Sequence, residues 1–368
     1  MKAMVIGVNL GLPDYAQHRQ EFDMLARGAG AEIVAELTAK RDRPDAATFI
    51  GSGKVEEAVA LCRLHEAEVV LFDQPLSPAQ QRNLERQFER RVVDRVALIL
   101  DIFALRAKSH EGKLQVELAQ LQHLATRLTR MWTHLERQRG GIGMRGPGES
   151  QLEMDRRMIG AKVRLLRERL DKLTRQRVTQ RRARARGASL SVSLVGYTNA
   201  GKSTLFNALT RANTYAADQL FATLDTTTRR LWIDQAGSVT LSDTVGFIRD
   251  LPHGLIAAFR ATLEEAIHAD LVLHVVDAAS EQRDEQIYQV QQVLTEIGAG
   301  EIPQIRIYNK IDVLELPPRI ERASHGTIQK VFISAQHREG LNFVRQAIAE
   351  FANGARTHAT NDQAVQFE

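Results

Sequence analysis

The chain has 368 residues, 43% of them apolar, and a net charge of +4, which suits two or three domains with separate cores. No apolar run approaches the roughly 20 residues of a membrane helix. Cys62 is the only cysteine, which excludes a disulfide framework or a cysteine metal site within the chain. The N-terminal MKAMVIGVNLGLPDYAQ resembles a first strand more than a signal peptide, because charge and turn residues come too early. We therefore expect a soluble protein of the cytoplasm without a membrane span. We also expect a monomer, although no residue pattern bears on oligomeric state.

Residues 1–108 alternate short apolar runs with helical patterns. MVIGV, AEIVAEL and AEVVLFD predict buried strands, and DYAQHRQEFDMLARGAG and GKVEEAVALCRLHEA predict the helices between them. This alternation indicates a small α/β domain. Its FIGSGKVEE segment resembles a phosphate loop, but Lys54 is followed by Val55 instead of Ser or Thr. We interpret it as a glycine turn at a helix N-terminus, which can still bind an anion.

Residues 109–187 predict an antiparallel helical hairpin. Apolar side chains recur at alternating steps of four and three, which is the pattern of two helices that pack along one seam. These positions are Leu114, Leu118, Leu121, Ala125, Leu128, Trp132 and Leu135, and then Ile159, Val163, Leu166, Leu170 and Leu173. Between the two series lies the glycine-rich stretch RGGIGMRGPGESQLEMDRR, and we expect residues 139–149 to form a loop at the tip.

Positive charge is concentrated in this hairpin. Residues 109–187 hold 19 Lys and Arg against 8 Asp and Glu, a net of +11, so the rest of the chain carries −7. Such asymmetry favours a polyanionic partner, most simply nucleic acid. A solvated helical surface would explain the charge count equally well.

Residues 188–354 predict a second α/β domain that begins with a phosphate-binding loop, and residues 355–368 form a polar tail without pattern. In GYTNAGKST, Gly196, Gly201, Lys202 and Ser203 match G-x-x-x-x-G-K-[ST] between a strand and a helix. The glycines let backbone N–H groups surround the phosphates, and Lys202 supplies charge to the β and γ phosphates. The Ser203 hydroxyl can ligate Mg²⁺.

Three further motifs follow in the order of a GTPase. Asp243 of DTVG can hold Mg²⁺ through water, and Gly246 can offer its N–H to a γ-phosphate. Thr223 of LFATLD offers a second hydroxyl to Mg²⁺ from a mobile switch. Asp312 of NKID can accept hydrogen bonds from both N1–H and the 2-amino group of guanine, which favours GTP over ATP. In VFISAQ, two small residues are placed to close over the base.

These motifs predict the whole site. We expect catalytic roles for Lys202, Thr223 and Gly246, and Mg²⁺ contacts from Ser203, Thr223 and, through water, Asp243. The predicted nucleotide-binding residues are Gly196, Tyr197, Thr198, Asn199, Ala200, Gly201, Lys202, Ser203, Thr204, Phe221, Ala222, Thr223, Leu224, Asp225, Asp243, Thr244, Val245, Gly246, Asn309, Lys310, Asp312, Ser334 and Ala335.

Two positions bear on the mechanism. Phe247 occupies the place where small GTPases carry a glutamine that orients the attacking water, so we expect slow hydrolysis that a partner stimulates. Asn199 lies where some GTPases use an asparagine to hold K⁺ beside the phosphates. We treat K⁺ as a hypothesis, since Asn199 could equally serve to shape the loop.

The chain resembles the HflX family of ribosome-associated GTPases. The resemblance rests on TFIGSGKVEE, LILDIFALRAKSHEGKLQVELAQL and GGIGMRGPGESQLEMDRR, together with GYTNAGKST, LFATLD, DTVGF and NKID, and runs from about residue 1 to 350. Many members carry a further small domain after the GTPase domain, where this chain has only the short tail.

The resemblance implies a protein that binds the large ribosomal subunit and splits or rescues stalled ribosomes, especially under stress. It also implies that ribosome contact stimulates hydrolysis, and that the N-terminal region and hairpin meet ribosomal RNA. Glycines allow close backbone approach to RNA and arginines neutralise phosphates, although a simple hinge would also use glycines. The candidate RNA-binding residues are Arg139, Gly140, Gly141, Arg145, Gly146, Gly148, Arg156 and Arg157.

Two other functions remain open. A large-subunit assembly GTPase would use the same chemistry on immature particles. An RNA-binding adaptor would carry the nucleotide only to stabilise its fold.

Overall fold

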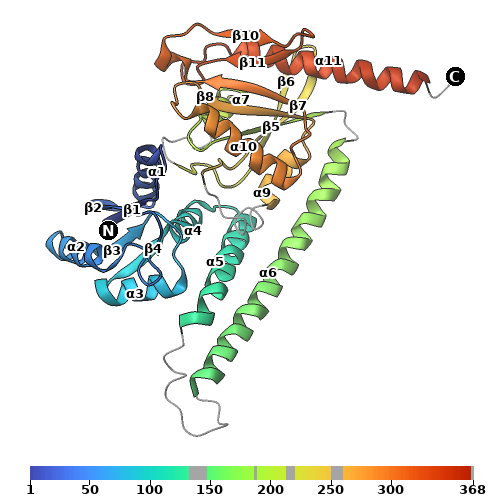
Figure 1. Ribbon diagram of the computed structural model, residues 1–368. Coiled ribbons are helices and arrows are strands. Elements are labelled where there is room, and N and C mark those ends of the chain that lie inside the picture. The colour runs from blue at the N-terminus through green and yellow to red at the C-terminus, as the bar shows by residue number, and fades with distance from the viewer. Residues whose placement is uncertain (132–146, 186–188, 213–219, 250–259, 366–368) are drawn as a thin grey trace. The chain divides into compact units, whose positions relative to one another are not determined.

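The computed structural model describes residues 1–131, 147–185, 189–212, 220–249 and 260–365 (Figure 1). The chain divides into two compact units, Met1–Asp171 and Lys172–Glu368. Each unit has its own sheet, and the long helix α6 (Pro147–Ala185) runs through the boundary between them.

The first unit begins with the predicted α/β domain. Its four-stranded sheet is wholly parallel, in the order β2-β1-β3-β4, as expected for strands joined by helices. The strands are β1 (Lys2–Asn9), β2 (Glu32–Lys40), β3 (Val69–Phe72) and β4 (Arg91–Asp94). The helices are α1 (Tyr15–Gly28), α2 (Ser52–Leu64), α3 (Pro78–Phe88) and α4 (Arg95–Arg106). Helix α2 begins directly after Gly51, as the glycine-turn interpretation of FIGSGKVEE requires.

The sequence patterns did not single out α3, β4 and α4. Strand β4 is only four residues long and runs directly into α4, so no alternating pattern develops. Helix α3 begins with a capping box, in which the Ser77 hydroxyl accepts from the Gln80 N–H at 3.2 Å and the Gln80 side chain accepts from the Ser77 N–H at 2.9 Å. Asp94 caps α4 by accepting from the Ala97 N–H at 2.9 Å.

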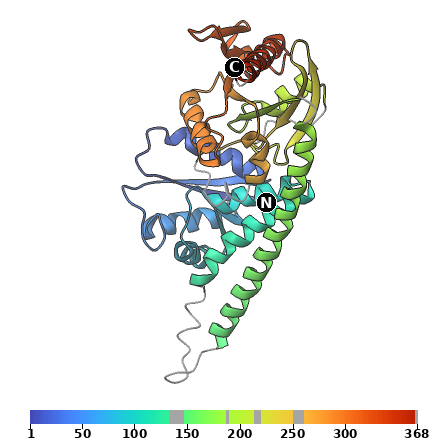
Figure 2. The same ribbon diagram turned by 90° about the vertical axis from the view of Figure 1, so that its right-hand side faces the viewer.

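The predicted helical hairpin is present. Helix α5 (His110–Met131) lies beside the first part of α6 in both views (Figures 1 and 2). The seam positions Leu114, Leu118 and Leu166 are buried, and Lys162 Nζ lies 2.7 Å from Glu117 Oε1 across the two helices. Apolar periodicity therefore gave the correct packing faces.

The expected tip loop of residues 139–149 is too long at its C-terminal side. Helix α6 already begins at Pro147, so Gly148 and the following glutamate are helical. A proline suits the first helical position, where its missing N–H would have no intrahelical partner. The rest of the expected loop lies outside the described residues.

The second unit has a seven-stranded sheet in the order β10-β11-β9-β8-β5-β7-β6. Its strands are parallel except at the two edges, where β6 and β10 are antiparallel to their neighbours. The strands are β5 (Leu190–Gly196), β6 (Thr227–Ile233), β7 (Gly237–Asp243), β8 (Leu271–Asp277), β9 (Gln304–Asn309), β10 (Arg319–Arg322) and β11 (Ile328–Phe332). Its helices after α6 are α7 (Lys202–Thr210), α9 (Arg260–Ile267), α10 (Arg283–Ile297), the short η2 (Ile311–Leu314) and α11 (Leu341–Val365).

The core of this unit lies between the sheet and helices α7 and α11. Leu205 and Phe206 of α7 and Ile348 of α11 pack against central strand residues such as Val192 and Leu273. Central strands of a parallel sheet are covered on both faces, which explains the almost fully apolar run of β8. The fold class predicted from the sequence is confirmed.

The polar tail expected at residues 355–368 is helical as far as Val365, because α11 continues through it. Alanine, arginine and glutamine have favourable helix propensities, so the helix continues beyond the last residue of the apolar pattern.

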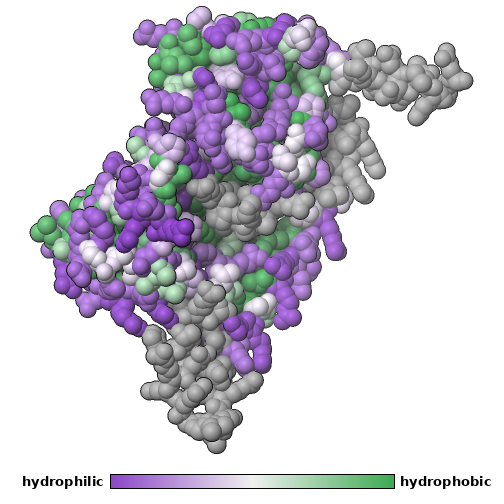
Figure 3. All heavy atoms as spheres, viewed as in Figure 1, coloured by the Kyte–Doolittle hydropathy of each residue, from purple (hydrophilic) through white to green (hydrophobic). Residues whose placement is uncertain are grey.

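The surface of the described residues is mostly hydrophilic on the face shown in Figure 3. Within the described part of the chain, every helix is too short or too polar to cross a bilayer.

Candidate nucleotide-binding site

The phosphate loop joins β5 to α7 and is shaped by two glycines. Gly196 has φ 153° and a Cβ there would lie 2.2 Å from the Val275 carbonyl oxygen. Gly201 has φ 91° and a Cβ would lie 2.2 Å from Asn309 Nδ2. Neither position tolerates a side chain, so the backbone can wrap closely before α7. The N-terminus of α7 then presents unpaired N–H groups and the positive end of its dipole.

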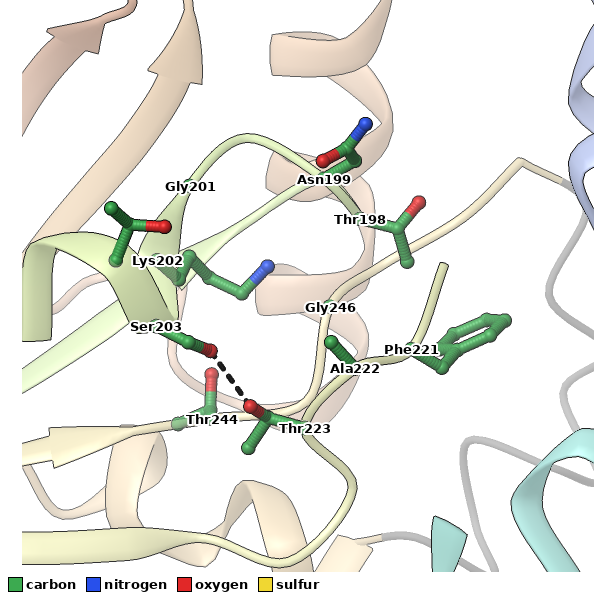
Figure 4. A pocket seen from close by; sticks show the side chains of 11 residues that line it. Thr198, Asn199, Gly201, Lys202, Ser203, Phe221, Ala222, Thr223, Thr244 and Gly246 are labelled. Carbon is green, nitrogen blue, oxygen red and sulfur yellow. Dashed lines mark hydrogen bonds between the residues drawn. The ribbon is translucent and has the colours of Figure 1, made fainter. Parts of the chain in front are cut away.

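Lys202, the first residue of α7, points into the pocket (Figure 4). Its side chain is buried, and Nζ donates to the carbonyl oxygens of Gly196 at 3.1 Å and Tyr197 at 2.8 Å. Burial lowers the pKa of Lys202 to about 8, with the opposing attraction of Asp243 as the smaller effect. A buried ammonium of this kind is a strong attractor for phosphate.

Three oxygen-bearing side chains meet beside Lys202. Ser203 Oγ lies 2.7 Å from Thr223 Oγ1 (Figure 4) and donates to Asp243 Oδ2 at 2.6 Å. Burial raises the pKa of Asp243, and the hydrogen bond from Ser203 opposes that rise. The second oxygen, Asp243 Oδ1, is buried without a hydrogen-bond partner. A buried carboxylate oxygen in this position is suited to a cation or to water held by one.

The described residues hold no group of three His, Cys, Asp or Glu side chains that could bind a metal ion. The hydroxyl and carboxylate oxygens beside Lys202 therefore remain the candidate donors. Hard oxygen donors of this type suit Mg²⁺, which keeps several water ligands and takes few from protein.

The base-binding motifs lie at the ends of β9 and β11. Asn309 Nδ2 donates to the Ala200 carbonyl at 2.9 Å, and Asn309 Oδ1 accepts from the Ala335 N–H at 2.9 Å. Asp312 Oδ1 is buried without a hydrogen-bond partner. A buried carboxylate oxygen that lacks a donor is suited to the donor edge of guanine.

Gly246 follows β7 and lies against the phosphate loop. A Cβ there would be 2.9 Å from both Lys202 Nζ and Thr198 Cα. Close backbone approach at this point requires glycine. The next residue, Phe247, is buried, so its ring cannot orient a water molecule in the pocket.

The structure brings most of the predicted phosphate-site residues into one pocket. Its lining consists of Thr198, Asn199, Gly201, Lys202, Ser203, Thr204, Phe221, Ala222, Thr223, Thr244 and Gly246. The ring of Phe221 points away from Ser203 and Thr223 (Figure 4). The predicted residues of the same segments that are not among the lining residues are Gly196, Tyr197, Ala200, Leu224, Asp225, Asp243 and Val245. Asn199 has φ 62°, a left-handed conformation that asparagine adopts more readily than most residues, and this agrees with a loop-shaping role.

The RNA-binding candidates are only partly covered. Arg156 and Arg157 are exposed on α6, and Gly148 is part of that helix. The remaining candidates, Arg139, Gly140, Gly141, Arg145 and Gly146, lie outside the described residues.

Sequence reasoning missed two residues near the site. Asp277, at the carboxyl end of β8, lies 2.7 Å from Lys310 Nζ and so anchors the lysine of NKID. A carboxylate that ends a buried strand was the available signal. His274 of the same strand is buried, and burial, assisted by Arg306 and Lys202, lowers its pKa to about 3. The position of His274 inside an apolar run did not reveal, from sequence alone, that its pKa would be lowered.

Comparison with known proteins decides the family. The chain is 54% identical over 336 residues to GTPase HflX of Escherichia coli, which covers 91% of this chain and 79% of that protein. The chain belongs to the HflX family of GTPases. GTPase HflX of Caldanaerobacter subterraneus is 45% identical, over 94% of this chain and 79% of that protein.

Three family models match successive stretches of this HflX-family chain. Residues 16–104 match a GTP-binding GTPase N-terminal region, residues 106–184 a GTP-binding GTPase middle region, and residues 191–310 a 50S ribosome-binding GTPase. Among solved structures, a GTP-binding protein of Sulfolobus solfataricus in complex with GDP is 23% identical, with a TM-score of 0.50. That match covers 96% of this chain and 100% of the other, and it supports the fold.

Proposed function

We propose that this HflX-family protein binds GTP with Mg²⁺, hydrolyses it to GDP and phosphate, and uses that cycle on the large ribosomal subunit to split or rescue stalled ribosomes under stress. The proposal that the protein binds GTP rests on one observation at each end of the expected nucleotide. Lys202 is buried at the phosphate end, and Asp312 carries an unpartnered carboxylate oxygen at the base end.

Mg²⁺ fits the donors present. Ser203 and Thr223 would hold it through their hydroxyls, and Asp243 through water. When bound, the ion neutralises charge on the phosphates. The unpartnered Asp243 Oδ1 supports this assignment. A buried carboxylate oxygen without a hydrogen-bond donor destabilises the fold unless a cation or a water molecule interacts with it.

The residues around the γ-phosphate position would act by orientation and charge. Lys202 would stabilise the negative charge that spreads over the transferred phosphoryl group. Thr223 and Gly246 would sense the γ-phosphate, so that its loss releases both switches. Because Phe247 is buried and has no polar group, water orientation must come from elsewhere, and we expect the ribosome to supply it.

The ribosomal part rests on likeness and charge. Residues 191–310 of the GTPase domain match a family described as 50S ribosome-binding GTPase, and the hairpin carries the concentrated positive charge that rRNA binding needs. Arg156 and Arg157 are exposed on α6 and available to phosphates. Action on ribosomes implies a cytoplasmic protein.

The deciding experiment is GTP hydrolysis with and without purified large subunits. We expect the wild-type rate to rise with subunits, and Arg156→Glu combined with Arg157→Glu to reduce that rise. Arg229→Glu with Arg230→Glu is the matched control, because it reverses two exposed arginines on β6, outside the hairpin. Substitution of K⁺ by Na⁺ in the same assay tests the K⁺ hypothesis for Asn199, and equal rates would refute it.

Other outcomes would favour the other functions. A rate of GTP hydrolysis that does not rise with large subunits would indicate an RNA-binding adaptor whose nucleotide only stabilises the fold. Co-sedimentation with precursor particles, and accumulation of precursors when the protein is lost, would indicate an assembly factor.

A further inference from the structure

Tyr197, the first residue after β5, is joined to the segment that follows Gly246. The residue is 7% exposed, and its hydroxyl oxygen accepts a hydrogen bond from the backbone N–H of Arg249 at 2.8 Å. Tyr197 occupies a variable position of the phosphate-loop motif, so the motif itself assigns no role to its side chain.

The backbone supports the same connection. Phe247 N–H donates to the Gly196 carbonyl at 3.1 Å, and Thr198 N–H donates to the Phe247 carbonyl at 2.6 Å. Tyr197 and Phe247 thus form a short parallel bridge. Together with the tyrosine hydroxyl, three hydrogen bonds fasten residues 247–249 to residues 196–198.

This fastening determines where Gly246 lies. Gly246 directly precedes the bridged residue, and a Cβ on it would be 2.9 Å from Lys202 Nζ. Gly246 is therefore held next to Lys202, the lysine that we expect to face the phosphates. Any loosening of residues 247–249 would let Gly246 move away from that lysine.

The tyrosine hydroxyl is the one side-chain group among these three bonds. It holds Arg249, whose guanidinium also donates to Gln282 Oε1 at 3.4 Å. A phenylalanine would keep the buried ring and the two backbone bonds, and would remove the hydroxyl that accepts from the Arg249 N–H.

We propose that Tyr197 is a positioning residue, which holds residues 246–249 so that Gly246 can read the γ-phosphate. This inference rests on the proposed GTPase function. The position of Gly246 should affect binding of a GTP analogue more than binding of GDP, because Gly246 is placed to contact the γ-phosphate and GDP has none. Loss of the hydroxyl therefore lowers affinity for a GTP analogue and the rate of hydrolysis more than it lowers affinity for GDP.

The test compares Tyr197→Phe with wild type and with Tyr288→Phe, which makes the same change at an exposed position on α10. GDP and a non-hydrolysable GTP analogue are titrated against each protein, and kcat and KM for GTP are measured with large subunits. We expect Tyr197→Phe to bind GDP within about twofold of wild type. We expect it to lose roughly threefold to tenfold in analogue affinity and in kcat, which is the effect of one hydrogen bond.

Two results would overturn the inference. An unchanged ratio of analogue to GDP affinity would show that the hydroxyl does not position Gly246. Equal losses for both nucleotides would show that Tyr197 only stabilises the loop. Failure of the proposed function is a separate result, since wild type and Tyr288→Phe would then also show no hydrolysis. The binding ratio would still decide the role of Tyr197.

Discussion

The amide group of Asn309 joins two motifs that are 109 residues apart in the chain, since its nitrogen donates to the Ala200 carbonyl at 2.9 Å. Its oxygen accepts from the Ala335 N–H, also at 2.9 Å. One side chain of the base-binding motif thus fastens both the phosphate loop and the segment expected to close over the base.

We predict that Asn309→Ala lowers both stability and affinity for GDP. It leaves a buried N–H and a buried carbonyl without partners, which costs about 1–3 kcal/mol of unfolding free energy per group. Urea denaturation and GDP titration measure the two effects. Asn83→Ala is the control, because it removes an exposed hydrogen bond to Ala47 and should change neither quantity appreciably. An equally small effect at Asn309 would contradict the prediction.

Asp312 should determine the base. In Asp312→Asn, one carboxylate acceptor becomes an N–H donor, which clashes with the 2-amino group of guanine and suits the carbonyl of xanthine. We expect GDP affinity to fall on the order of 100-fold and xanthosine diphosphate affinity to rise. Competition binding with the two nucleotides checks this. If the variant keeps its preference for GDP, Asp312 does not contact the base.

Ser203→Ala should raise the Mg²⁺ concentration required for GTP binding by about tenfold or more, because one of few protein ligands is lost. Titration of Mg²⁺ at fixed nucleotide measures it. Ser193→Ala is the matched control, since its hydroxyl is buried in β5 and lies outside the pocket lining. An equal response of the two variants would place the metal elsewhere.

We predict that, above neutral pH, the protein takes up a proton at Lys202 when it binds nucleotide. The pKa of Lys202 is lowered to about 8 by burial, and phosphates beside it favour the charged form, so the pKa rises on binding. Affinity for GDP should then be constant below pH 8 and fall by up to about tenfold per pH unit above it. Calorimetry in buffers of different ionisation enthalpy should show about half a proton taken up at pH 8 and almost none at pH 6.5. Binding without proton uptake at pH 8 to 9 would contradict this.

His274 should make the protein sensitive to mild acid. Its pKa is lowered to about 3 in the folded state, below the ordinary value of about 6.5. The unfolded chain therefore binds the proton first, so the stability is complete above pH 6.5 and is lost as the pH falls towards 3. The loss is at most about 1.4 kcal/mol per pH unit.

Urea denaturation at pH 7.5 and 5.5 tests this. His274→Leu should lose less stability between the two values than wild type does. His268→Leu, at an exposed position that follows α9, should behave like wild type. Identical pH dependence in all three proteins would show that His274 does not cause the effect.

Short-range features of this chain were evident from the sequence. The phosphate loop needs glycines at 196 and 201 because of local φ values and close contacts, and the four-and-three spacing of leucines predicts the seam of α5 and α6. Such features depend on residues close together in the chain, so they can be recognised from the sequence alone. The GTPase motifs, their order and the preference for guanine followed from them.

Other features depended on segments brought together from far along the chain. The pairing of Asp277 with Lys310, the bond from Arg249 to Tyr197 and the burial of His274 carry no local pattern. The start of α6 at Pro147 and the continuation of α11 beyond residue 354 were also missed, because helix ends depend on backbone hydrogen bonds more than on apolar spacing. Sequence determined which chemical groups this protein has for binding GTP. Tertiary structure decided which of them are buried, and burial sets their partners and their pKa values.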